Sequence, residues 1–150
     1  MFRTTDTSYW NHPKTRGLPF HAKAIYQYLW TNEYTHVSGI YRIKKANILD
    51  ELDLKSSEFD KFFQVLIKNG LIHWDADRQI IWVVSMLEHQ IKTRNDKIKA
   101  GIVAHLDTLY HTPLIPLFLK YYQADNIPYQ YPTDTSLKNR IRFRSGFRSG

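Results

Sequence analysis

The clearest hydrophobic pattern in the chain lies within residues 57–70 and predicts an amphipathic helix. Its apolar side chains recur at helical spacing, which places them on one face: Phe59, Phe62, Phe63, Leu66 and Ile67. We expect Ser57 to cap the start of this helix, with Asp60 completing a variant capping box. Asn69 and Gly70 are expected to end the helix in a left-handed turn.

Weaker patterns precede this helix. A first helix is predicted to open at Leu18-Pro19, where proline suits the first turn. Alternating and β-branched positions over residues 37–43 predict a short strand, and a second helix is expected over residues 45–53. Residues 1–17 are mostly polar, so we expect an N-terminal arm whose Trp10 packs back onto the domain.

Two strand-like runs follow, at residues 71–74 and 79–84, and the polar turn between them predicts a β-hairpin. The predicted order is therefore helix, strand, helix, helix and hairpin. Two short helices joined by a tight turn and followed by a two-stranded ribbon are typical of a winged helix-turn-helix. We predict an α+β fold in which a winged helix-turn-helix domain precedes a short C-terminal helical extension.

The pattern beyond residue 92 predicts that extension. A helix is expected over residues 96–110, and Thr112 is expected to cap a further one with Pro113 at its first position. We expect one small domain to leave part of the apolar stripes of both helices uncovered. They are therefore candidates for forming a homodimer or for docking another protein.

Three segments make up the predicted organisation of the chain. Residues 1–92 are expected to form the winged-helix domain with its arm, and residues 93–126 the helical extension. Residues 127–150 lack periodicity and end in a direct repeat of Phe-Arg-Ser-Gly, so we expect a disordered basic tail there.

Composition excludes several classes of protein. The 150 residues are 43% hydrophobic and 23% charged, which is typical of a globular chain. No apolar run approaches the roughly 20 residues of a membrane-spanning helix, and the polar start lacks a secretory signal. The absence of cysteine excludes disulfides, thiolate zinc sites and cysteine nucleophiles. We expect a soluble intracellular protein that does not associate with membranes.

The positive charge is concentrated at one end of the chain. The formal net charge is +7, but residues 135–150 hold five cations and no acid. The remaining residues 1–134, with 16 basic and 14 acidic side chains, carry only +2. A basic chain is a candidate for binding polyanions, although most of this excess belongs to the predicted tail.

The polar face of the helix predicted within residues 57–70 offers a candidate DNA-reading surface. A row of four residues spans about 16 Å of helix, comparable with a major groove about 12 Å wide: Ser57, Lys61, Gln64 and Lys68. The first three would touch base edges, and Lys68 would lie nearer the phosphate backbone of the DNA. The alternative is an ordinary solvated face, and Glu58 and Asp60 beside the row would repel phosphates.

Cations elsewhere would add phosphate contacts. Four flank the predicted helix-turn-helix and hairpin: Lys44, Lys45, Lys55 and Arg78. In the tail, arginines alternate with aromatic residues and form a second candidate site, for single-stranded nucleic acid: Arg140, Arg142, Arg144 and Arg148. The alternative for this tail is a merely solubilising end.

Signals for catalysis are poor. The seven histidines form no HExxH or paired-ligand motif, and neither a phosphate-binding glycine loop nor GxSxG occurs. His89, His105 and His111 could converge in space, but their spacing carries no ligand signature. We predict a protein that is not an enzyme and needs no cofactor or metal.

Residues 2–92 resemble the N-terminal winged-helix domain of phage replisome organiser proteins, which is related in type to primosomal loader domains. Five short matches carry the resemblance: Phe2-Arg3, Tyr9-Trp10, residues 38–41 (SGIY), residues 66–72 (LIKNGLI), and residues 82–84 (WVV) leading to His89-Gln90. Residues 97–102 are similar to the helix that often follows in such proteins. The resemblance implies binding of double-stranded DNA during phage replication in the cytoplasm of a bacterial host, with recruitment of other replication proteins.

Two other functions remain open. The +2 charge of residues 1–134 favours a protein-interaction module that inhibits or adapts a host protein. A transcriptional repressor would use the same DNA-binding physics and differ only in the site that it recognises.

Overall fold

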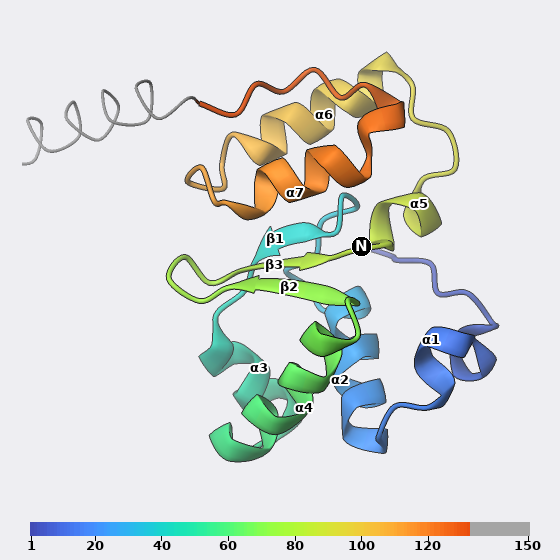
Figure 1. Ribbon diagram of the computed structural model, residues 1–150, viewed down its shortest axis with the longest axis vertical. Coiled ribbons are helices and arrows are strands. Elements are labelled where there is room, and N and C mark those ends of the chain that lie inside the picture. The colour runs from blue at the N-terminus through green and yellow to red at the C-terminus, as the bar shows by residue number, and fades with distance from the viewer. Residues whose placement is uncertain (133–150) are drawn as a thin grey trace, which may run out of the picture.

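Three layers make up the fold in the computed structural model, which describes residues 1–132. Within these residues, seven α-helices and a three-stranded antiparallel sheet form an α+β fold. Figure 1 shows the sheet in the middle, with α2, α3 and α4 on one face and α6 and α7 on the other.

The elements follow one another with short connections. Those of the first half are η1 (Tyr9–Asn11), α1 (Pro13–Arg16), α2 (Phe20–Thr31), β1 (Ile40–Arg42), α3 (Lys45–Leu52) and α4 (Ser56–Lys68). Those of the second half are β2 (Ile72–Asp75), β3 (Ile80–Val83), α5 (Met86–Gln90), α6 (Asp96–Leu106), α7 (Leu114–Tyr121) and η2 (Gln123–Asp125).

The sheet has the order β1-β3-β2, so the last strand lies in its centre. Trp82 of β3 lies opposite Ile40 of β1 on one side and His73 of β2 on the other. Neighbouring side chains of a strand point to opposite faces, and all four residues of β3 are buried. The predicted hairpin at residues 71–84 is therefore confirmed as the antiparallel pair of β2 and β3.

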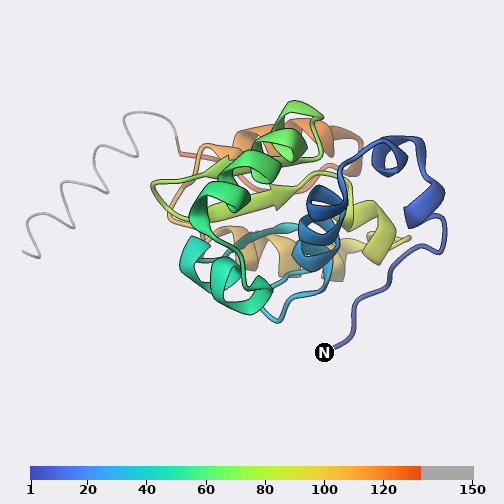
Figure 2. The same ribbon diagram turned by 90° about the horizontal axis from the view of Figure 1, so that it is seen from below.

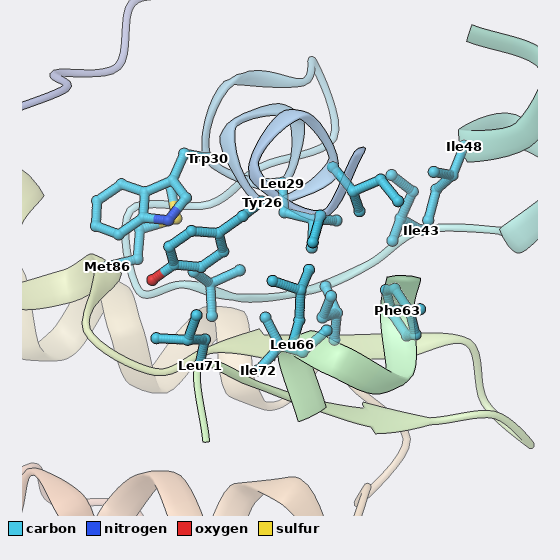
Figure 3. Close-up of a cluster of buried hydrophobic side chains, with 14 of the residues drawn as sticks. Tyr26, Leu29, Trp30, Ile43, Ile48, Phe63, Leu66, Leu71, Ile72 and Met86 are labelled. Carbon is cyan, nitrogen blue, oxygen red and sulfur yellow. The ribbon is translucent and has the colours of Figure 1, made fainter. Parts of the chain in front are cut away.

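The first hydrophobic core fills the space between the sheet and the helices α2, α3 and α4 (Figure 3). Leu29 of α2 and Leu66 of α4 are fully buried there, and Ile81 and Val83 of β3 close it from the sheet side. The predicted apolar stripe of residues 57–70 supplies the α4 contribution, with Phe59, Phe63 and Leu66 as its most buried members.

The second core lies on the opposite face of the sheet. Ile80 and Trp82 of β3 point into it, against apolar side chains of α6, α7 and the segment between them: Ile102, Leu106, Leu109, Leu114, Ile115 and Phe118. The sheet buries most of these stripes, so the expected incomplete coverage is limited to a small part of α7. Leu117 and Tyr121 remain 46% and 47% exposed.

Three local predictions differ from the structure. The strand predicted over residues 37–43 shortens to Ile40–Arg42, because residues 37–39 form a turn with Gly39 at a φ of +84°. Ser57 is not the N-cap, since α4 already begins at Ser56 and Lys55 precedes it. In the arm, Tyr9 is buried in place of Trp10, which is 58% exposed.

The segment just after residue 126 also differs from the expected disorder. Ile127, Tyr129 and Tyr131 pack against the second core, and the Tyr131 hydroxyl donates a hydrogen bond to the carbonyl of His111. The rest of the predicted tail lies outside the described residues.

The close packing around Gly39 predicts a loss of stability when a side chain is added there. A Cβ added there would lie 2.7 Å from the Val83 carbonyl oxygen and 2.8 Å from Met86 Cβ, at a φ that side chains rarely adopt. Gly39→Ala should therefore lower the free energy of unfolding by about 2–4 kcal/mol in urea denaturation. The control is Gly101→Ala, at a position in α6 with open space around it, which should raise stability by about 0.5–1 kcal/mol. Equal stability of the two variants would contradict this account.

Candidate nucleic-acid interface

The outer face of α4 presents the predicted polar row to solvent. Ser57, Lys61, Gln64 and Lys68 are all exposed, while the opposite face of the helix packs into the first core. Figure 2, seen from below, shows α2, α3 and α4 in front of the sheet, with α6 and α7 behind it. Among residues 1–132, the second helical layer therefore leaves this row uncovered.

Asp60, which was predicted to complete a capping box at the start of α4, has a different partner. The N-cap residue Lys55 makes no side-chain capping hydrogen bond. Asp60 forms an ion pair with Lys45, with 2.8 Å between Nζ and Oδ1. The same ammonium lies 5.4 Å from the centre of the Phe59 ring. Lys45 is thus directed toward α4, and Asp60 offsets its charge.

The other flanking cations differ in how they are held. Lys44 and Lys55 are exposed at the starts of α3 and α4. Arg78, in the β2–β3 turn, pairs with Asp75 at 3.3 Å and donates from Nε to the Tyr110 carbonyl at 3.3 Å. Two of the four predicted flanking cations are therefore already in ion pairs.

Charge around the row is balanced. Residues 44–68 contain five lysines and five carboxylates, so the segment that holds α3 and α4 has no net charge. Lys61 Nζ lies 5.3 Å from the centre of the Phe62 ring, which is half-buried and packs against the first core. The surface suits specific hydrogen bonding better than long-range attraction of a polyanion.

A basic hollow beside this surface brings the predicted phosphate contacts Lys44 and Arg78 together with Arg42, which was not predicted. It measures about 270 Å³ and its seven lining residues include three cations and no carboxylate: Tyr34, Arg42, Ile43, Lys44, Asn47, Arg78 and Gln79. Arg42 and Arg78 lie 36 positions apart in the chain, and no periodicity connects them. Only the antiparallel pairing of β1 with β3, which sets Arg42 opposite Ile80, brings them together.

The tail arginines remain a prediction. Arg140, Arg142, Arg144 and Arg148 lie outside the described residues, so the structure gives no geometry for them.

The histidines do not assemble into one site. His89 contacts Trp30, His111 contacts Tyr131, and His105 stacks face to face on His36 with ring centres 3.6 Å apart. Within residues 1–132, no group of three or more histidine and carboxylate side chains is arranged to hold a metal ion.

The stacked pair is electrically neutral because of its surroundings. Burial lowers the pKa of His36 to about 4; the positive charge of Arg3, and the charge that His105 would carry if protonated, lower it further. Burial also lowers the pKa of His105, against the opposing effect of its 2.7 Å hydrogen bond with the Ile40 carbonyl. The pair joins the α2–β1 connection to α6.

Every helix within residues 1–132 is too short or too polar to cross a membrane. Comparisons of the chain with protein-family models, curated proteins and solved structures found no match.

The His36–His105 pair predicts a loss of stability in acid. A histidine with a depressed folded pKa stabilises the fold fully above its unfolded pKa of about 6.5, and this contribution is lost as the pH falls toward 4. Between pH 7 and pH 5, the free energy of unfolding should fall by about 1–2 kcal/mol more in the native chain than in His36→Asn, after allowance for partial exposure. Urea denaturation at both pH values measures this difference, and parallel losses in the two proteins would refute the assignment.

Proposed function

We propose that this protein is a non-catalytic, winged-helix DNA-binding protein of phage type that acts in the initiation of DNA replication. The observation that carries the proposal is the solvent-exposed row of Ser57, Lys61, Gln64 and Lys68 on α4. In this hypothesis, α4 enters the major groove of DNA and its N-terminal half contacts the base edges.

The connectivity supports the winged-helix assignment. The order α2, β1, α3, α4, β2 and β3 has a helix pair followed by a hairpin, and β1 joins that hairpin as a third strand. The α3–α4 pair would be the helix-turn-helix, and the β2–β3 hairpin would be the wing. The sequence resemblance to phage replisome organisers adds the role in replication, in the cytoplasm of a bacterial host.

The charge balance makes a second copy or a partner part of the proposal. With no net charge on residues 44–68, one copy would bind duplex DNA only weakly, because phosphate neutralisation supplies most non-specific affinity. A homodimer would add a second half-site, and Leu117 and Tyr121 of α7 are exposed apolar candidates for such a contact or for a replication protein.

The same charge balance favours a second candidate, a module that binds a host protein. Neutral surfaces with exposed aromatic side chains suit protein partners better than polyanions. Phe20, which is 74% exposed at the start of α2, would serve such an interface. A transcriptional repressor shares the DNA-binding mode and would differ in its target site.

Fluorescence anisotropy with a pool of randomised duplexes separates these functions. The full chain is used with its four tail arginines changed to glutamine, so that the tail does not dominate. Lys61→Ala with Gln64→Ala should weaken binding at least tenfold, because two base or phosphate contacts are lost. The slope of log affinity against log salt should also become shallower by about 1, for the lost lysine.

The control is Lys97→Ala with Lys120→Ala, which removes two exposed positive charges, one more than the α4 variant, from α6 and α7 across the sheet. This control should leave the affinity within about twofold, since exposed charges beyond a Debye length are largely screened. Equal effects of the two double variants, or the absence of salt-dependent binding, would exclude α4 as the DNA-reading surface.

A further inference from the structure

The basic hollow collects cations from three separate elements. Arg42 ends β1, Lys44 directly precedes α3, and Arg78 comes from the β2–β3 turn. Asn47 and Tyr34 add neutral polar groups to the lining, and the lining contains no carboxylate. Cationic side chains that converge on one concave surface are the arrangement that recognises a phosphate group.

One residue of the second helical layer holds both arginines. The Tyr110 hydroxyl accepts a hydrogen bond from Arg42 Nη1 at 2.9 Å, and its ring centre lies 4.9 Å from the Arg42 guanidinium carbon. The Tyr110 carbonyl accepts a bond from Arg78 Nε at 3.3 Å. In Figure 1, the α6–α7 loop that carries Tyr110 lies at the same edge of the molecule as the β2–β3 turn.

The backbone of that loop is strained where it makes these contacts. Tyr110 and His111 both have left-handed conformations, with φ of +55° and +54°. Such conformations cost roughly 1 kcal/mol or more for each residue other than glycine and persist only where the surroundings hold them. Tyr110 makes both of its arginine contacts from this conformation.

Both arginines keep donors for a ligand. A guanidinium carries five N–H donors; Arg42 uses one of them on Tyr110, and Arg78 uses two, on Tyr110 and Asp75. The first backbone N–H of α3 is already bonded to Gln79 Oε1 at 2.9 Å. Recognition in the hollow therefore depends on side chains.

We propose that the basic hollow binds a phosphate of a nucleic-acid backbone, with Arg42 and Arg78 as donors positioned by Tyr110 and with Lys44 as the third cation. This inference rests on the proposed DNA-binding function, because it assigns the anchor that fixes the strand while α4 meets the bases. The hollow opens directly beside the α3–α4 segment through Lys44 and Asn47. A polymer bound at the hollow would thus lie beside the helix that precedes α4.

The test compares Arg42→Gln with Arg16→Gln, a matched loss of one exposed arginine from α1, in the full chain. Binding to randomised duplexes should weaken about 5- to 20-fold in Arg42→Gln and less than twofold in Arg16→Gln. The salt slope should fall by about 1 only in Arg42→Gln, with unchanged sequence preference. Urea denaturation of both variants verifies that each is folded.

Tyr110→Phe tests the positioning role. It keeps the ring and the net charge but removes the hydroxyl that accepts from Arg42. The affinity should fall about two- to fivefold while the salt slope stays unchanged, a combination that a loss of charge or of folding does not produce. Affinity equal to that of the native chain would exclude positioning by the hydroxyl.

Three outcomes separate this proposal from the proposed function. If the Lys61→Ala, Gln64→Ala variant loses duplex affinity but Arg42→Gln equals Arg16→Gln, the function stands and the hollow is overturned as its anchor. If Arg42→Gln loses affinity and the α4 variant does not, the hollow is supported and α4 is not the reader. If duplex binding is absent and inorganic phosphate raises the unfolding midpoint of the native chain but not of Arg42→Gln, the nucleic-acid assignment is overturned and the hollow takes free phosphate.

Discussion

The two-sided burial of β3 is the constraint on which the rest of the structure depends. Ile81 and Val83 face one core while Ile80 and Trp82 face the other, so the central strand needs a helical layer on each side. Each fully buried large apolar side chain contributes about 1.5–3 kcal/mol relative to exposure. Loss of either layer would therefore remove several kcal/mol, a large part of the stability of an ordinary domain.

Elements with strong local signals could be predicted from the sequence. The stripe from Phe59 to Ile67 and the left-handed Gly70 fixed α4 and its end, and both agree with the structure. The shortened β1 could not be predicted, because the turn at Gly39 is set by its close approach to Val83 and Met86, over 40 positions away. The burial of α6 and α7 could have been predicted from residues 80–84, because an unbroken apolar run indicates a strand that is covered on both faces.

Part of the candidate site could likewise be predicted from the sequence, and part of it could not. The α4 row follows from helical spacing alone, and its exposure agrees with that expectation. The partners of its neighbours do not follow, because Asp60 reaches back to Lys45 across the turn between two helices. Arg42 carried no signal in the sequence, since its place beside Arg78 depends on strand pairing and its orientation depends on Tyr110, 68 positions further along the chain.

The second helical layer matters to the interface as well as to the core. Since residues 44–68 have no net charge, a strand docked on α4 gains little from electrostatics there and needs positive charge from another part of the molecule. The basic hollow supplies such charge, and its two arginines are held by a loop between α6 and α7. The helices that close the second core thereby also fix the orientation of the nearest cations. Residues 1–92 without them would keep the α4 row but lose Tyr110, which holds Arg42 and Arg78, so the C-terminal helices belong to the binding surface that we propose.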